Sequence, residues 1–206
     1  MNLDREFDAR ARELVAVGRI LHERGWVPAT SGNFSARLSD GSLAITVSGR
    51  HKGRLTVDDI MRLDAQGHPL DGRKPSAEAA LHLALYRRYP EVQAVLHPHS
   101  PGAVLASRLF KGQVVLADHE LLKSLEGIKT HAQQVVVPIF PNDQDIERLA
   151  RRVEAYIDHQ GDIHAYIIAG HGFYTWGRSI EAALTRVEAL EFMFECEVRL
   201  HGVRQR

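Results

Sequence analysis

Apolar residues recur along the chain with two spacings, and the difference separates predicted helices from predicted strands. In residues 4–24 they recur at helical spacing, and Gly25 follows as the expected C-cap. Four further helices are predicted, over residues 75–89, 100–110, 143–159 and 179–199. Ser76 and Ser179 stand where the N-caps of two of these helices are expected.

Short apolar runs bounded by polar or turn residues predict the strands. They cover residues 33–38, 43–47, 92–97, 134–140 and 164–170. Because helices alternate with strands throughout, we expect an α/β sandwich around a central sheet. No repeat, low-complexity segment or linker divides the chain, so we expect one domain over residues 1–206.

The composition of the chain limits which partners and which cellular compartment we expect. Lys plus Arg and Asp plus Glu each number 26, so nothing favours a nucleic acid partner. No apolar run approaches the roughly 20 residues of a membrane span, and the first residues lack the apolar core of a signal peptide. The single Cys196 excludes an intrachain disulfide. We therefore expect a cytoplasmic protein that is not bound to a membrane.

A pair of histidines ends one predicted strand. His97 and His99 are separated by one residue, and such residues in an extended segment project to the same face. Imidazole is a favoured ligand of zinc and similar metals. His171 follows another buried-looking run and offers a third ligand. Three histidines from two strand ends leave a coordination position open, which is typical of a catalytic metal site.

Two other metal-binding classes share part of this pattern. A zinc metallo-hydrolase would continue the pair as His-x-His-x-Asp-His, whereas Ser100, Pro101 and Gly102 follow here. A cupin also uses His-x-His and a later histidine, but its fold is all-β, which the predicted helices contradict. Both classes are excluded.

Small polar loops follow or precede several strands. Residues 30–35 and 46–53 are rich in Ser, Thr, Gly and Asn, and the second loop includes a cationic residue. Such residues are common in plain turns, but their hydroxyl and backbone N–H groups also cradle anions. Ser76 at a predicted helix N-terminus adds a third such place. Together with a metal site, these loops suggest a small phosphorylated substrate.

Two glutamates, Glu78 and Glu120, stand in apolar surroundings. Most glutamates of this kind are exposed helix residues. Near a divalent metal, however, a carboxylate can serve as a ligand or as the base that moves a proton.

Taken together, these residues resemble the class II aldolase/adducin family. The matching features, in chain order, are Ser31-Gly32-Asn33-Phe34-Ser35, Ser48-Gly49, Pro75-Ser76-Ala77-Glu78, His97-Pro98-His99-Ser100 and His171-Gly172. Three more stretches are similar to family members that dehydrate a methylthio-substituted ketose phosphate in methionine salvage. These are Glu120-Leu121-Leu122-Lys123, Val137-Pro138-Ile139-Phe140 and His171-Gly172-Phe173-Tyr174-Thr175-Trp176-Gly177.

The resemblance implies a three-layer sandwich whose central mixed sheet is flanked by helices, and a homotetramer with the site near a subunit interface. It implies one zinc ion per subunit, held by His97, His99 and His171. Glu120 is implied as the catalytic acid and base. The residues implied to bind the phosphate of a sugar-phosphate substrate are Asn33, Ser48, Gly49 and Ser76.

Two residues keep more than one interpretation. Glu78 matches a carboxylate that sugar-phosphate aldolases use as metal ligand and acid/base, so its presence does not separate dehydration from aldol chemistry. Lys123 fits either a phosphate or oxyanion contact or a helix surface. An aldolase or epimerase acting on a ketose phosphate therefore remains the alternative function. A non-catalytic adducin-like module is a further alternative, which the three histidines disfavour.

Overall fold

The computed structural model describes residues 2–204, in which one eight-stranded sheet forms the centre of the molecule. The spatial order of the strands is β3-β2-β1-β4-β8-β7-β6-β5. Only β6 and β7 pair in parallel, so the sheet is mixed, as expected. The strands are β1 (Asn33–Arg37), β2 (Leu43–Thr46), β3 (Ile60–Leu63), β4 (Ala94–His97), β5 (Gln113–Leu116), β6 (Val135–Phe140), β7 (Ala165–Ile168) and β8 (Gly172–Gly177).

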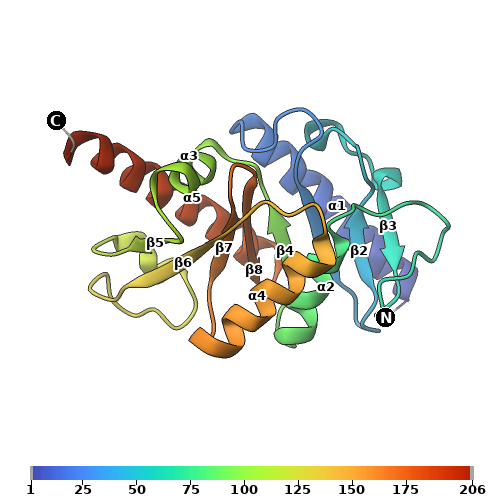
Figure 1. Ribbon diagram of the computed structural model, residues 1–206. Helices are drawn as coiled ribbons and strands as arrows, with labels where there is room; N and C mark the ends of the chain where they lie inside the picture. The colour runs from blue at the N-terminus through green and yellow to red at the C-terminus, as the bar shows by residue number, and fades with distance from the viewer. Residues whose placement is uncertain (1, 205–206) are drawn as a thin grey trace.

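Helices cover both faces of the sheet and complete a three-layer sandwich. In Figure 1, α2 and α4 lie in front of the sheet, and α1, α3 and α5 lie behind it. Each side has its own apolar core. The helices are α1 (Leu3–Glu23), α2 (Ala79–Arg88), α3 (Pro101–Leu109), α4 (Ile146–Gln160) and α5 (Ile180–Arg204), with short 3₁₀ helices η1 (Lys52–Arg54), η2 (Val57–Asp59) and η3 (Glu120–Ser124).

Strand alternation decides which polar residues face α2. In β4, Leu96 packs in the core under α1, α3 and α5, whereas Val95 packs in the other core. His97 follows Val95 by two residues and therefore continues the α2 face. Asn33 pairs directly with His97 in the antiparallel register of β1 and β4. Two polar residues at the ends of neighbouring strands thus lie side by side on that face.

The predicted start of the second helix is wrong. α2 begins at Ala79, and its N-cap residue is Glu78 instead of Ser76. Pro75 forms an isolated bridge with Val47, which keeps this part of the chain beside β2 instead of in a helix. The Ser76 hydroxyl accepts a hydrogen bond from the Glu78 backbone N–H at 3.3 Å. Ser76 is therefore not the N-cap residue of α2 and lies in the loop before it.

The ends of two other helices follow their capping residues. α4 begins at Ile146, later than the predicted residue 143, because Asp145 caps it by accepting a hydrogen bond from Arg148 N–H. The capping role expected for Ser179 is confirmed, since its hydroxyl accepts from Ala182 N–H at 3.0 Å. α5 runs on to Arg204, past the predicted end at residue 199.

Three strands were not expected from the sequence. β3 and β5 form the two edges of the sheet, and their sequences, Ile60-Met61-Arg62-Leu63 and Gln113-Val114-Val115-Leu116, do not alternate between apolar and polar residues. β8 is buried along its whole length and mixes glycine, threonine and aromatic residues. A strand that is buried on both faces lacks the alternation by which strands are recognised.

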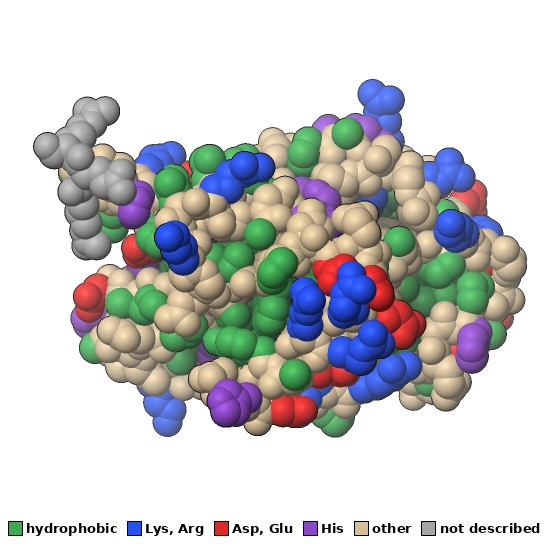
Figure 2. Space-filling view, in the orientation of Figure 1, with side chains coloured by type: hydrophobic (Ala, Val, Ile, Leu, Met, Phe, Trp, Pro, Cys, Tyr) green, Lys and Arg blue, Asp and Glu red, His purple; other side chains and the backbone are tan. Residues whose placement is uncertain are grey.

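The surface carries charges of both signs. Figure 2 shows basic and acidic side chains gathered together over the region of α4. Asp143, for example, pairs with both Arg148 and Arg152. Within residues 2–204, no helix combines the length and apolar character that a membrane crossing requires.

Candidate metal centre and adjoining pocket

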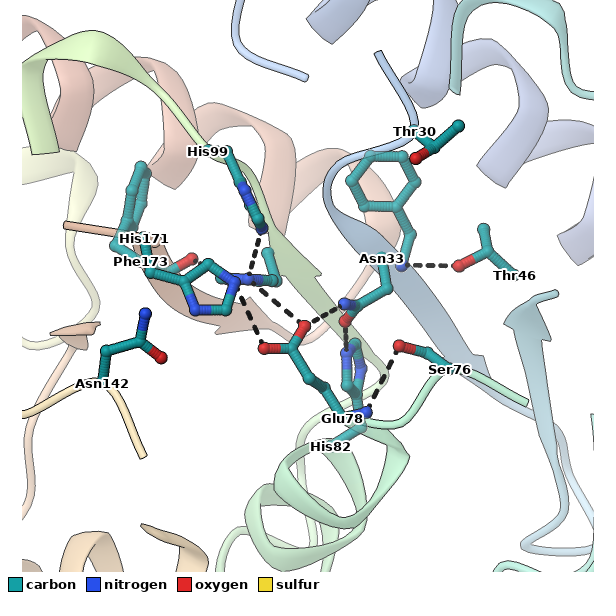
Figure 3. Close-up of polar contacts among 12 residues, drawn as sticks. Thr30, Asn33, Thr46, Ser76, Glu78, His82, His99, Asn142, His171 and Phe173 are labelled. Carbon is teal, nitrogen blue, oxygen red and sulfur yellow. Dashed lines mark hydrogen bonds and ion pairs between the residues drawn. The ribbon is translucent and has the colours of Figure 1, made fainter. Parts of the chain in front are cut away.

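Four side chains converge at one end of the central strands. Glu78, His97, His99 and His171 each offer a ligand atom, and these atoms lie within 4.8 Å of one another. Glu78 precedes α2, His97 ends β4, His99 follows it, and His171 lies in the turn between β7 and β8. We call these four residues the Glu–His cluster. Figure 3 shows Glu78 between His171 on one side and Asn33 on the other.

The ring of His97 is held from both sides. It is fully buried, and its Nδ1 donates a hydrogen bond to the backbone carbonyl of Phe173 at 2.8 Å. The ring also stacks on Tyr174, with centroids 4.1 Å apart. Because Nδ1 carries the proton, Nε2 presents a lone pair to the cluster.

Backbone contacts bring the other two histidines to His97. The Nε2 atoms of His99 and His97 are 3.0 Å apart, and the ring centroids of His99 and His171 are 4.4 Å apart. Gly172, next to His171, passes so close to the other segment that a Cβ atom there would lie 2.3 Å from the Pro98 carbonyl oxygen. Only glycine permits this approach, which fixes the spacing between the two histidine-bearing segments.

Glu78 completes the cluster. Its Oε1 lies 3.3 Å from His171 Nε2, and its Oε2 lies 3.5 Å from His97 Nε2. The side-chain amide of Asn33 donates to Oε2 at 2.6 Å. Oε1 is buried and makes no hydrogen bond among the described residues. A buried carboxylate oxygen without a hydrogen bond is unfavourable, so this atom has capacity for a further ligand.

A chain of buried hydrogen bonds stands behind Glu78. Asn33 accepts through its carbonyl oxygen from His82 Nε2, and His82 Nδ1 accepts from the Ser35 hydroxyl at 2.7 Å. Ser35 in turn accepts from the Tyr86 hydroxyl at 2.9 Å. Burial lowers the pKa of His82 to about 4, so the ring is neutral and keeps one donor and one acceptor. The chain holds the amide of Asn33, and through it the carboxylate of Glu78.

The donor set fits a divalent cation. Burial lowers the pKa of His97 well below its ordinary value, with the neighbouring His171 adding to the effect. Burial, followed by the charges of His97 and His171, lowers the pKa of His99 to about 2. Both rings therefore offer lone pairs at neutral pH. Neutral imidazoles together with a carboxylate form the kind of ligand set that zinc and similar metals prefer.

A cavity of about 280 Å³ adjoins the Glu–His cluster and is lined in part by Glu78 and His99. All four residues implied to bind phosphate line it as well, namely Asn33, Ser48, Gly49 and Ser76. Gly49 has a φ of +74°, which favours glycine and turns the loop after β2 around the cavity. The wall also includes Lys52, whose burial no sequence pattern indicates, since lysine is rarely buried.

Asn33 lines the cavity and also contacts the Glu–His cluster. Both ends of its side-chain amide are occupied, by Glu78 on one side and His82 on the other. The residue is 3% exposed. These contacts position Glu78, and the second N–H of the Asn33 amide remains a donor on the side chain that lines the cavity.

Comparison with known proteins identifies the fold family. Residues 12–198 match the family model of the class II aldolase and adducin N-terminal domain. The chain belongs to this family.

Two curated relatives of this family match almost the whole chain. A methylthioribulose-1-phosphate dehydratase of Methylococcus capsulatus is 64% identical over 202 residues, covering 98% of this chain and 99% of the relative. A protein of the same name from Pseudomonas paraeruginosa is 50% identical, covering 97% and 98%.

Two solved structures share the fold. The L-fuculose-1-phosphate aldolase of Thermus thermophilus superposes with a TM-score of 0.78 at 26% identity, covering 97% of this chain and 99% of that one. YgbL from Escherichia coli gives a TM-score of 0.79 at 27% identity, with coverage of 92% and 88%.

The two residues implied from the Glu120-Leu121-Leu122-Lys123 stretch lie away from the Glu–His cluster. Glu120 begins η3, and its side chain is 69% exposed. It forms an ion pair with Lys123 and lies 3.9 Å from His131. The exposed ion pair with Lys123 lowers the pKa of Glu120. Neither Glu120 nor Lys123 belongs to the cluster or to the wall of the adjoining cavity.

Proposed function

We propose that this chain is a hydro-lyase that converts 5-methylthioribulose 1-phosphate to 2,3-diketo-5-methylthiopentyl 1-phosphate. The observation that carries the proposal is the 64% identity, over 98% of the chain, to a protein named for this activity. The cavity beside the Glu–His cluster supports it, because a phosphorylated ketose needs an anion pocket next to the reacting carbons. The methylthio group of the substrate would place the reaction in methionine salvage. The cytoplasmic location stays a prediction.

We propose zinc as the metal, one ion per subunit, with His97, His99 and His171 as its ligands. The support is the convergence of three imidazoles with a carboxylate oxygen of Glu78 that makes no hydrogen bond among the described residues. When bound, a divalent cation supplies a Lewis acid for the carbonyl and hydroxyl oxygens of the substrate. The role of the protein is then to place the substrate and to move one proton.

The proton has a defined route in this reaction. A carboxylate removes the proton from C3, and the same group, now protonated, returns it to the departing C4 hydroxyl, which leaves as water. The enol that remains tautomerises to the 2,3-diketone. Such general acid–base help contributes roughly 10²- to 10⁴-fold to the rate. We propose Glu120 for this role, as the family resemblance implies.

Glu120 is exposed and lies outside the Glu–His cluster of its own subunit. We therefore propose that it serves the site of a neighbouring subunit in a homotetramer. An apolar groove of about 440 Å³ next to η3 supports such an assembly. Leu121, adjacent to Glu120, lines it with 40% exposure, and Phe192 of α5 lines it with 56% exposure. Large exposed apolar side chains that gather around one groove are typical of a protein interface.

Mixing two inactive variants tests this shared site. Glu120→Gln subunits keep their histidines, and His99→Ala subunits keep their glutamate. After the two are unfolded and refolded together, about a quarter of the sites in a ring-like tetramer would combine an intact His99 with an intact neighbouring Glu120. We expect activity to return to about that fraction of the wild-type value. Mixtures that stay inactive, while wild-type protein recovers from the same treatment, would exclude the shared site.

The overall reaction is tested with purified, metal-loaded protein and 5-methylthioribulose 1-phosphate. We expect the absorbance of the diketone to appear. The rival is an aldolase, favoured by the contact of Glu78 with His97 and His171. An aldolase would release dihydroxyacetone phosphate and an aldehyde instead, and their formation without diketone would decide for it. A non-catalytic module would give neither set of products.

A further inference from the structure

Lys52 is a buried lysine at the start of η1, and it lines the cavity beside the Glu–His cluster. Its side chain is among the largest that are fully buried, with 1% exposure. The Nζ atom donates hydrogen bonds to the backbone carbonyls of Thr30 at 2.9 Å and Arg50 at 2.7 Å. Because an ammonium group has three N–H donors, these two acceptors leave one donor for the cavity.

The charge of Lys52 lacks a contacting counter-charge within the described chain. Its two acceptors are neutral carbonyls, and Glu78 acts on it electrostatically without forming an ion pair. Burial consequently lowers the pKa of Lys52 to about 8, and the charge of Glu78 offsets this in part. Burying an unpaired ammonium is unfavourable. An anion that binds next to Nζ would therefore stabilise the folded protein.

Ser31 provides a second unsatisfied donor in the same cavity. Its hydroxyl oxygen is buried and has no hydrogen-bond partner among residues 2–204. Ser31 follows Thr30, whose carbonyl accepts from Lys52 Nζ, and both Ser31 and Lys52 line the cavity. An unpartnered buried hydroxyl is uncommon in proteins. An oxyanion with several acceptor oxygens, such as phosphate, would satisfy both groups at once.

We propose that Lys52 binds the phosphate group of the substrate, with the Ser31 hydroxyl beside it, and so selects phosphorylated over unphosphorylated ketoses. This inference rests on the proposed function in that it takes a ketose 1-phosphate as the ligand. In such a ligand only the ester oxygen and C1 separate phosphorus from the carbonyl carbon. The cavity that contains Lys52 extends to Glu78 and His99. A phosphate held by Lys52 therefore keeps the carbonyl end next to the Glu–His cluster.

The test measures binding of inorganic phosphate by titration calorimetry, with metal-loaded wild-type protein and two variants. Lys52→Met keeps the length of the side chain and removes the charge. Lys111→Met, at an exposed position between α3 and β5, is the matched control. We expect Lys52→Met to weaken phosphate binding by roughly 10- to 100-fold, as the loss of a charged hydrogen bond does. Lys111→Met should bind phosphate as the wild type does. Phosphate affinity within twofold of wild type in Lys52→Met would overturn the inference.

Two further variants keep the test decisive. If Lys52→Met does not fold, Lys52→Gln retains an N–H donor for the carbonyl acceptors while it removes the charge, and the same loss is expected. Ser31→Ala should weaken phosphate binding by roughly 2- to 10-fold, the range for a neutral hydrogen bond. In the enzymatic assay, Lys52→Gln should raise KM by more than it lowers kcat, because it removes binding shared by ground and transition states. A lowered kcat at unchanged KM would contradict a phosphate-binding role.

The outcomes separate this inference from the proposed function. Wild-type protein that binds phosphate through Lys52 but does not convert 5-methylthioribulose 1-phosphate would refute the substrate and leave the phosphate site standing. Protein that converts this substrate, and whose Lys52 variants keep both KM and phosphate affinity, would refute only the role of Lys52.

Discussion

Glu191 of α5 accepts a hydrogen bond from the backbone N–H of Gly102, in the first turn of α3, at 2.7 Å. Its carboxylate also accepts from the Ser100 hydroxyl and from Ala103 N–H. A fully buried carboxylate thus caps the N-terminus of the helix that directly follows His99. This position satisfies free N–H groups and complements the helix dipole. The longest helix of the fold thereby fastens the segment that carries two of the histidines.

Glu191→Gln is therefore expected to destabilise the protein. The amide keeps the shape but loses the charge and one acceptor, so the free energy of unfolding should fall by roughly 1–3 kcal/mol. Burial raises the pKa of Glu191, and this desolvation limits the loss. Urea denaturation checks the prediction. Glu188→Gln, on the same helix but in an exposed pair with Arg24, serves as the control. Equal midpoints for the two variants would contradict the capping role.

Each of His97→Ala, His99→Ala and His171→Ala should lower the bound metal and nearly abolish turnover. Loss of a ligand should weaken metal binding by at least the roughly 10- to 100-fold that loss of an outer-shell partner causes. Elemental analysis after dialysis measures this. His68→Ala changes an exposed histidine that pairs with Asp64, and it should retain its metal. A metal-free wild-type protein with full activity would refute the metal-dependent mechanism.

The two glutamates should give different losses when each is changed to glutamine. Glu120→Gln should keep its metal and lose roughly 10²- to 10⁴-fold in rate, because the amide cannot exchange the proton. Glu78→Gln should instead disturb metal binding, since its carboxylate contacts His97 and His171. Metal content and diketone formation, measured for both variants, test this. An active Glu120→Gln enzyme beside an inactive Glu78→Gln enzyme would assign the proton transfer to Glu78.

Lys52 should make the stability of the ligand-free protein depend on pH. The pKa of Lys52 is about 8 in the folded protein, against an ordinary value of 10.5. Below pH 8 both states are protonated, and the folded state bears the full cost of burying the ammonium. Between pH 8 and 10.5 the unfolded state binds more protons, so stability rises with pH. Above this range the cost is gone.

The free energy of unfolding of the wild type minus that of Lys52→Met isolates this effect, because Glu78 and the other charged groups near the cavity are common to both proteins. We expect this difference to rise across the range from pH 8 to 10.5 and then to level off. Chemical denaturation at several pH values measures it, with Lys111→Met in place of Lys52→Met as the control. A difference that stays constant over this range would mean that Lys52 is not buried as a charge.

Local patterns predicted most of the fold but only part of the site. The extended segment predicted over residues 92–97 placed His97 and His99 on one face, because side chains two residues apart in a strand point the same way. The alternation of helices and strands predicted the class of fold. The contact between Asn33 and Glu78 joins residues 45 positions apart. It depends on the register of β1 and β4 and on a helix that starts at Ala79, neither of which follows from local sequence.

The burial of Lys52 likewise depends on tertiary structure. The lysine is surrounded only because η1 packs against α1 and because the loop before β1 folds over it. The exposure of Glu120 is likewise not predictable from its neighbours in the sequence. Its apolar neighbours in the sequence do not shelter it within one subunit, since Leu121 beside it is itself 40% exposed.

The hydrogen bond from His97 to Phe173 also affects how the site tolerates mutation. The acceptor is a main-chain oxygen, while the Phe173 side chain packs in the core under α1, α3 and α5. A substitution at position 173 changes that core and leaves the carbonyl where β8 holds it. The tautomer of His97 is therefore determined by the main chain of β8 and not by any side chain. Neutral drift can repack the residues behind the sheet without altering which nitrogen His97 presents to the cluster.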